Sequence, residues 1–313
     1  MDALTPLYDV APIFISGTQR SGTTMFRLML DAHPEISIPF ETGIITNYCF
    51  KVSEFGDLDQ DDNLRSLLQA IRNEPFVARG ELVDISYEEI TPLLKARTLA
   101  GLVDALFGAN ARRKGKAMWG DKTPDEDVKT LHHLFPNATI IHLIRDGRDC
   151  AVSRVRRWGA RSIPELAHGW CFKVNSTRQA GRLYGDRYRE IRYEDLVRSP
   201  ETVLRKVCSW IGVSFDPVML DYYKHATERM PASSVKLHHE TSVKPVDPNK
   251  IGMYKDQMSR SDRLAYERVA GALLKELGYE VEADVGLLGK MQIRLAEIRY
   301  ALRGQTLFRA PGT

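Results

Sequence analysis

The apolar positions at the start of the chain first follow a strand pattern and then a helix pattern. Residues 12–16 form a short run of apolar and β-branched residues that ends at Gly17, which is typical of a strand. Over residues 25–32 the apolar residues recur at the spacing of one helical face. Pro34 ends this helix, because the residue before a proline is disfavoured in helical geometry. A second short extended segment, residues 36–40, is expected to follow.

Two later runs predict further strands. Residues 138–144 are almost continuously apolar, which is typical of a strand covered on both faces, and residues 145–158 then predict a turn and a helix. Residues 188–193 predict a third strand. It leads into a helix over residues 199–212, which has Ser199 as N-cap, proline at the first helical position and glycine as stop signal. Helix resumes over residues 261–278.

The region between the extended segment at 36–40 and the strand at 138–144 has a different composition. Residues 51–115 are acidic and polar, with helical patterns at 62–72 and 88–107 and no strong strand signal, so they predict a helical insertion. Residues 231–258 are rich in proline and polar residues and predict a surface loop. Strands that alternate with helices predict an α/β fold, with a central parallel sheet, flanking helices and right-handed crossovers. We expect one domain over residues 1–282.

Length and composition exclude several classes of protein. The 313 residues are 43% hydrophobic, enough for a sizeable core. No stretch approaches the roughly 18 consecutive apolar residues of a membrane span, and no basic segment leads into an apolar run at the start, so we expect a cytoplasmic protein. The cysteines have no spacing that suggests zinc or redox chemistry and are expected to be reduced, buried thiols. They are Cys49, Cys150, Cys171 and Cys208.

The charge of the chain is small and concentrated at one end. The formal net charge of +3 is too weak to indicate a nucleic-acid partner. Residues 283–313 hold five basic and two acidic residues, which equals this whole excess. Five apolar residues there alternate at spacings of three and four, which predicts a basic amphipathic helix. They are Leu288, Met291, Leu295, Ile298 and Leu302. Such a tail packs on the body, forms a homodimer contact or lies peripherally on a membrane.

The turn after the first strand has the glycine spacing of a phosphate-binding loop. Residues 17–24 read Gly-Thr-Gln-Arg-Ser-Gly-Thr-Thr, with Thr23 where a nucleotide P-loop has lysine. Backbone N–H groups at such a turn and at a helix N-terminus still favour an anion, and Arg20 adds a cation. The alternatives are a tight turn with a surface arginine, a P-loop kinase or NTPase, and a nucleotide-binding module without turnover. The absent lysine and the lack of an evident magnesium-binding acidic strand end oppose the kinase.

A second anion-binding pattern follows the strand at 138–144. Arg145 stands at its carboxyl end, where open α/β sheets bind ligands, and Ser153 lies eight residues later on the expected helix. The alternative for Arg145 is an ion pair with Asp146 or Asp149, and for Ser153 a solvated helix position. Two anion sites about 120 residues apart match one diphosphorylated nucleotide better than two unrelated ligands.

These motifs resemble those of the sulfotransferase family. The string RSGTTMFRLMLDAHPE with Glu41 after it is similar to the 5′-phosphosulfate loop, especially of the tyrosylprotein and related bacterial branch, and IIHLIRDGRDCAVSRVRRW resembles the 3′-phosphate motif. The resemblance implies a P-loop-NTPase-like fold, the donor 3′-phosphoadenosine 5′-phosphosulfate (PAPS), the product adenosine 3′,5′-bisphosphate (PAP) and no required metal. It implies these donor-binding residues: Gly17, Arg20, Ser21, Gly22, Thr23, Thr24, Arg145, Ser153, Arg157 and Tyr193. For Arg157 the alternative is a solvated side chain, and for Tyr193 a core aromatic.

The resemblance also implies which residues are catalytic. Glu41 takes the position of the general base, and Lys122, in the segment GDKTP, that of the lysine near the transferring group, where it stabilises charge together with Arg20. A carboxylate of ordinary pKa is a weak base toward an alcohol, so this role requires partial burial or late proton transfer. The alternatives are an ion pair of Glu41 with a helical lysine or arginine, and a solvated loop lysine at Lys122.

Two departures from the tyrosylprotein pattern affect the expected acceptor. Gly252 stands where those enzymes have a serine that contributes to donor activation, and the uncharged run TGIITNY replaces the arginines that they place after the glutamate. We therefore expect an alcohol on a glycan, lipid or secondary metabolite as acceptor, with a protein tyrosine as the alternative. Residues 51–115 and 231–258 are expected to form the acceptor surface. The adjacent histidines at 132–133 and 238–239 would point apart, so no metal site is expected.

Overall fold

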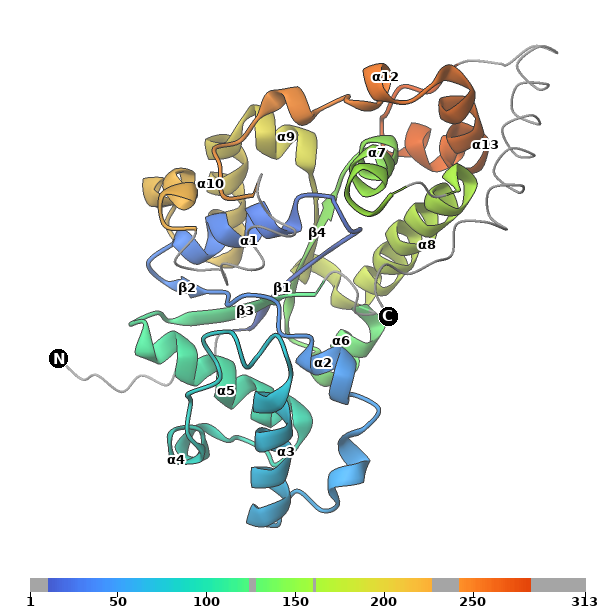
Figure 1. The fold of residues 1–313 in the computed structure, drawn as a ribbon. Coiled ribbons are helices and arrows are strands. Elements are labelled where there is room, and N and C mark those ends of the chain that lie inside the picture. Colours follow the sequence, from blue (N-terminus) through green and yellow to red (C-terminus); the bar gives the residue numbers. More distant parts are fainter. Residues whose placement is uncertain (1–10, 124–127, 160–161, 227–241, 283–313) are drawn as a thin grey trace.

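A five-stranded parallel sheet forms the centre of the computed structural model, which describes residues 11–123, 128–159, 162–226 and 242–282 (Figure 1). The strands are β1 (Ile13–Gly17), β2 (Ile36–Ser37), β3 (Met118–Lys122), β4 (Thr139–Ile144) and β5 (Tyr188–Arg192). Their order is β2-β3-β1-β4-β5, and every pair is parallel. The predicted α/β fold with a central parallel sheet is therefore confirmed.

Strand β1 lies in the middle of the sheet and is buried along its whole length. It pairs with β3 on one side and with β4 on the other, so that Ile15 is opposite both Lys122 and Ile141. Because the carboxyl ends of parallel strands share one edge of a sheet, Gly17, Lys122 and Ile144 end their strands at the same edge. This register places the predicted loop, the predicted lysine and the predicted strand-end arginine close together.

The alternation of side chains along β1 separates two apolar cores. Ile13 and Ile15 pack on one face with α1 (Thr23–Ala32), α10 (Pro200–Ile211) and the 3₁₀ helix η5 (Pro217–Lys224). Phe14 points to the opposite face, as the period of two in a strand requires. There it contacts Trp119 and Phe135, in a core shared with the helical excursion.

The excursion between β2 and β3 is helical, as predicted. It contains α2 (Ile44–Tyr48), η2 (Val52–Phe55), α3 (Asp61–Asn73), α4 (Tyr87–Ile90), η3 (Thr91–Leu93) and α5 (Leu99–Arg113). The single helix expected over residues 88–107 is instead divided. A capping box at Ser86 begins α4, and the Thr98 hydroxyl accepts a hydrogen bond from the Gly101 N–H to begin α5. The segment between η3 and α5 is not helical.

A third core joins the helices that follow β4. It contains α7 (Gly147–Trp158), α8 (Ile163–Gly181), α12 (Tyr254–Gln257) and α13 (Arg260–Glu276). Gly147 is required at the start of α7, since a Cβ there would lie 2.2 Å from the Tyr266 hydroxyl oxygen. The buried Arg148 side chain ties α7 to α13 through ion pairs with Asp146 at 2.7 Å and Glu267 at 2.5 Å. The remaining elements are α6 (Val128–Leu134), η4 (Arg182–Arg187), α9 (Tyr193–Arg198) and η7 (Pro248–Lys250).

Several local predictions differ from the structure. Strand β3 was not predicted, because its sequence, Met-Trp-Gly-Asp-Lys, contains only two apolar residues and no β-branched one. Tyr193 begins α9 instead of ending β5. Ser199 is the N-cap of α10, as predicted, but its side chain makes no capping hydrogen bond. Helix α8 was not anticipated.

Part of the predicted organisation lies outside the described residues. This applies to the tail 283–313 and to residues 231–241 of the predicted loop, so the single-domain boundary at 282 stays a prediction. All four cysteines are described, and none forms a disulfide; Cys150 and Cys208 are buried. No helix in the described ranges is both long and apolar enough to span a bilayer.

Candidate active site

The loop that connects β1 to α1 is tightly folded. The Ser21 N–H donates to the Thr18 carbonyl oxygen at 3.1 Å. Both Arg20, with φ of 71°, and Gly22, with φ of 97°, adopt left-handed backbone geometry. Left-handed residues interspersed in a turn direct successive N–H groups toward one side, and such concave turns bind anions. The loop is thus suited to a phosphate or a sulfate.

Both glycines of the loop are needed because neighbouring groups approach closely. A Cβ at Gly17 would lie 2.6 Å from the Leu143 carbonyl oxygen. A Cβ at Gly22 would lie 2.6 Å from the ring of Tyr193, in addition to the strain of its positive φ. The second contact places the buried Tyr193 against the predicted phosphate loop, so this residue is close to the candidate site.

The two predicted anion-binding motifs meet directly. The Arg20 Nε donates to the Ser153 hydroxyl at 3.0 Å, although the residues are 133 positions apart. Burial lowers the pKa of the Arg20 guanidinium, and the positive charges of Arg145 and Arg157 lower it further. Three arginines therefore face one region, where a multiply charged anion would relieve their mutual repulsion.

Arg145 is buried at the centre of this region. Its Nη1 donates to the Arg20 carbonyl oxygen at 3.1 Å, and its Nη2 to the Lys250 carbonyl oxygen at 2.5 Å. Its guanidinium carbon also lies 4.3 Å from the centroid of the Tyr193 ring. Burial acts to lower the pKa of Arg145, but Cys150, Tyr193 and other neighbours outweigh it, and the pKa is raised.

The ion pair considered as an alternative for Arg145 is present as well. Its partner is Asp149, with Nη2 and Oδ2 3.6 Å apart, whereas Asp146 pairs with Arg148. The fully buried Asp149 also accepts hydrogen bonds from the Gly252 N–H at 2.8 Å and the Tyr254 N–H at 2.9 Å. Burial raises the pKa of Asp149 in spite of these partners. Asp149 thus fixes Arg145 and the segment at Gly252 together, a role that the sequence did not reveal.

The predicted base and the predicted lysine are in contact. The Lys122 Nζ forms an ion pair with Oε1 of Glu41 and lies 3.4 Å from the Thr24 hydroxyl of the loop. The side chain of Lys122 is 3% exposed, so the solvated loop lysine considered above is wrong: the residue ends strand β3. The side chain of Glu41 is 29% exposed, and its partner comes from a strand, not from a helix.

Buried acids hold the backbone on both sides of Glu41. Before it, Asp31 accepts from the Ile38 N–H at 2.9 Å, and Arg27 donates to the Ile38 carbonyl oxygen at 2.7 Å. After it, the Thr42 hydroxyl donates to Asp121 at 3.3 Å. The other oxygen of Asp121 accepts from the Lys122 N–H at 2.8 Å. These residues were not predicted from the sequence, where the available signal was charge within the apolar pattern of α1 and β3.

The residues fit a nucleotide with two separate anionic ends. The loop residues Gly17, Ser21, Gly22, Thr23 and Thr24 form one part and the Arg145–Ser153 region the other, with Arg20 between them. The Ser21 hydroxyl is fully buried and has no hydrogen-bond partner within the described residues, which is costly unless a ligand supplies one. This orphan group lies in the loop assigned to the 5′-phosphosulfate.

No group of three or more histidine, cysteine, aspartate or glutamate residues that could hold a metal occurs in the described ranges. His132 packs edge-on against Tyr184, with ring centroids 4.9 Å apart. The pair at 238–239 lies outside the described residues. Gly252, which stands at the position of the family serine, has left-handed geometry with φ of 76°.

Replacing Arg145 by glutamine is expected to weaken PAP binding by about 10–150-fold, because one charge-assisted interaction contributes about 1.5–3 kcal/mol. Binding of adenosine 5′-monophosphate, which lacks the 3′-phosphate, should change little. Calorimetric titration of both nucleotides measures the difference, with the exposed Arg198→Gln as matched control. An equal loss for both nucleotides would show that Arg145 serves only the ion pair with Asp149.

Comparison with known proteins agrees with this geometry. A family model described as "Sulfotransferase family" matches residues 12–217. Protein-tyrosine sulfotransferase A of Caenorhabditis elegans is 25% identical over 285 residues, which cover 89% of this chain and 70% of the worm protein. Nodulation protein NoeE of Sinorhizobium fredii is 25% identical over 302 residues, covering 87% of this chain and 68% of NoeE.

Solved structures show the same fold. The sulfotransferase domain of the Synechococcus PCC 7002 olefin synthase superposes with a TM-score of 0.55 at 23% identity, covering 87% of this chain and 97% of that domain. The sulfotransferase domain from the curacin biosynthetic pathway superposes with a TM-score of 0.54 at 19% identity, covering 87% and 99%. Because the family match spans well over half of the chain and includes both phosphate motifs, the protein belongs to the sulfotransferase family and is a PAPS-dependent O-sulfotransferase.

Proposed function

We propose that this enzyme transfers the sulfuryl group of PAPS to an alcohol of a glycan, lipid or secondary metabolite, with Glu41 as general base. The observation that carries this proposal is the contact of Lys122 with both Glu41 and Thr24. It joins an acidic group, a buried cation and the phosphate loop at one edge of the sheet. These are the groups that an in-line transfer to a hydroxyl requires.

In this reaction the acceptor oxygen forms a bond to sulfur while the bond from sulfur to the 5′-phosphate oxygen breaks. Glu41 takes the proton of the acceptor hydroxyl, and PAP leaves with the electron pair of the broken bond. Glu41 is partly exposed, so an acceptor can reach its carboxylate. Lys122 and Arg20 stabilise the negative charge that develops on the transferred group and the leaving oxygen.

The same arrangement supports roles for the donor-binding residues. Arg145, Ser153 and Arg157 are proposed to bind the 3′-phosphate, with Tyr193 against the nucleotide. Arg20 bonds to Ser153 and faces the charges of Arg145 and Arg157, so the loop and the 3′-phosphate region are joined before any ligand binds. PAPS supplies the sulfuryl group when it is bound; the protein supplies position and charge.

The residues after Glu41 favour an alcohol over an acidic peptide. No arginine or lysine occurs from residue 42 to residue 50. Helix α2 instead buries Ile44, Ile45 and Tyr48 in the core of the excursion. An acidic peptide would find no cation on this helix. Transfer to protein tyrosine is the second candidate, favoured by the names of relatives such as the worm enzyme.

An acceptor panel tests the proposal. With radiolabelled PAPS, we expect transfer to alcohols in fractionated glycan, lipid and small-metabolite extracts to exceed transfer to a tyrosine peptide flanked by acidic residues. Thermal shift should show stabilisation by PAP and none by ATP with magnesium. If the tyrosine peptide were labelled in preference to the alcohols, protein tyrosine would replace the alcohol as the proposed acceptor. Stabilisation by ATP alone would contradict both.

The organisation of the whole chain follows from the same proposal. We infer a single catalytic domain over residues 1–282, followed by a basic amphipathic tail at 283–313. The tail is proposed to mediate homodimerisation or peripheral membrane contact, and the cytoplasmic location also stays a prediction. Its composition, with five basic and two acidic residues, supports such a contact.

A further inference from the structure

Trp158 is the last residue of α7 and ends the second anion-binding motif, but no role has been given to it above. The residue is 41% exposed and belongs to none of the three apolar cores of the described residues. Packing in a core therefore does not account for the position of this large ring. Its neighbours at the donor loop do.

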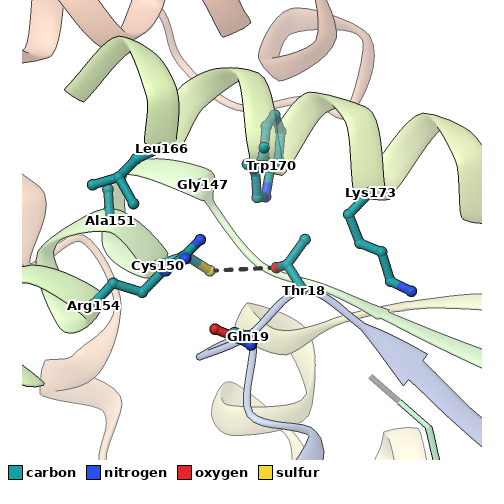
Figure 2. A pocket seen from close by; sticks show the side chains of 10 residues that line it. Thr18, Gln19, Gly147, Cys150, Ala151, Arg154, Leu166, Trp170 and Lys173 are labelled. Atoms are coloured by element: carbon teal, nitrogen blue, oxygen red, sulfur yellow. Dashed lines mark hydrogen bonds between the residues drawn. The ribbon is translucent and has the colours of Figure 1, made fainter. Parts of the chain in front are cut away.

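The donor loop lies along α7. Figure 2 shows the start of this contact, where the Thr18 hydroxyl and the Cys150 thiol lie 3.8 Å apart beside a cavity of about 210 Å³. Further along the helix, the Arg20 Nε donates to the Ser153 hydroxyl at 3.0 Å. At the carboxyl end of the helix, the guanidinium carbon of Arg20 lies over the Trp158 ring, 5.9 Å from its centroid. The loop therefore contacts α7 as far as its last residue.

The contact between Arg20 and Trp158 is a cation–π interaction. A guanidinium within about 6 Å of a ring centroid is attracted by the negative face of the ring, and tryptophan is the strongest of the aromatic side chains in this role. The hydrogen bond to Ser153 alone would leave the planar guanidinium free to turn about that bond. The ring of Trp158 adds a second point of contact and so restricts the orientation of the plane.

The surroundings of Arg20 make such a contact useful. Burial lowers the pKa of its guanidinium, and the positive charges of Arg145 and Arg157 lower it further, so the same charges repel the side chain. An acidic partner would also hold Arg20, but it would repel an anionic donor. The ring of Trp158 attracts the cation and carries no net charge, so it does not compete with the donor.

We propose that Trp158 is a positioning residue that holds the Arg20 guanidinium toward the sulfuryl group of the donor. This inference rests on the proposed function, in which Arg20 stabilises the charge that develops during transfer. Trp158 acts through Arg20 and contacts neither substrate. A cation that is already oriented needs no rearrangement when the charge develops, and this preorganisation raises the rate of the chemical step.

Trp158→Leu tests the proposal, because it keeps an apolar side chain and removes the aromatic ring. We expect the rate of transfer at saturating radiolabelled PAPS to fall about 2–30-fold, the range for cation–π contacts from exposed to desolvated sites. The acceptor in this assay is the most strongly labelled fraction of the panel described above. The dissociation constant of PAP, measured by calorimetric titration, should change less than the rate, because PAP lacks the sulfuryl group. Trp158→Tyr keeps an aromatic face and should retain most of the rate.

A double variant distinguishes positioning from a merely structural role. Arg20→Gln alone is expected to lower the rate about 10²–10³-fold. If Trp158 acts through Arg20, adding Trp158→Leu to this variant should lower the rate little further, since the two residues share one effect. A loss of the same size in both backgrounds would overturn the proposal. Trp158 would then contact a substrate directly or only support the fold.

The matched control is Trp210→Leu. The Trp210 ring lies 5.6 Å from the guanidinium carbon of Arg189, so this variant removes the same kind of contact between α10 and β5, which hold none of the proposed site residues. It should keep the full rate, and thermal denaturation checks that each variant is folded. An unchanged rate in Trp158→Leu, or equal losses in Trp158→Leu and Trp158→Tyr, would overturn the proposal and leave the proposed function standing. A wild-type protein that transfers no sulfuryl group from PAPS would instead overturn the proposed function.

Discussion

Replacing Glu41 by glutamine is expected to lower the turnover number by about 10²–10⁴-fold, the range that a general base contributes. The amide keeps the shape of the side chain but cannot take the proton of the acceptor hydroxyl. The affinity for PAP should stay close to that of the wild type, because the arginines and Ser153 of the donor region are unchanged. Steady-state transfer at saturating PAPS and calorimetric titration with PAP measure the two quantities.

The matched control for this prediction is Glu54→Gln, in the exposed part of η2. It removes the same charge from the same region and should leave turnover unaltered. Glu41 is partly exposed, and glutamine keeps its shape and an amide oxygen that can accept a hydrogen bond from Lys122, so the variant should remain folded. Unchanged turnover in Glu41→Gln would show that Glu41 is not the general base. Its ion pair with Lys122 would then be its only role.

Substitution of Lys122 by glutamine should reduce turnover by about 10²–10³-fold, as is typical when one group that stabilises developing charge is removed. The Lys122 side chain is buried and touches both Glu41 and the Thr24 hydroxyl. The loss should fall more heavily on turnover than on the dissociation constant of PAP, which lacks the sulfuryl group. Single-turnover rates measured with saturating PAPS separate the chemical step from product release.

Lys129→Gln on the exposed side of α6 is the control for charge removal. Since Lys122 and Glu41 are in contact, the double variant should be much less impaired than the product of the two single effects predicts. Fully independent effects would show that the two residues act in separate steps. A loss confined to PAP affinity would make Lys122 a donor-binding residue alone.

The strands that were predicted from the sequence are those with dense apolar runs. The run at 138–144 corresponds to β4 and that at 188–193 to β5, within one residue at each end. Strand β3 escaped prediction, because its burial comes from pairing with β1 and β2 and not from its own composition. For the same reason the position of Lys122 on a buried strand could be found only in the structure.

The residues of the candidate site that belong to sequence motifs were predicted, and those that reach the site only through tertiary packing were not. The Arg20–Ser153 hydrogen bond joins two motifs that the family resemblance assigned to one ligand. Asp149 was considered only as one of two alternative partners of Arg145, and Asp121 was not expected, since a sequence does not show which carboxylate tertiary packing will bury. Each fixes a predicted residue: Asp149 pairs with Arg145, and Asp121 accepts from the Lys122 N–H.

The sheet separates the core that holds α1 from the core that holds the helical excursion, and a third core joins the helices that follow β4. Helix α1, which continues the donor loop, packs in one core, and the helical excursion packs in the other. Apolar substitutions inside the excursion therefore leave the apolar contacts of α1 unchanged, and polar contacts of Lys114 and Lys116 with Asp31 join the end of the excursion to α1. Apolar substitutions in the excursion could therefore change the acceptor specificity of such a protein while the affinity for the sulfuryl donor is retained.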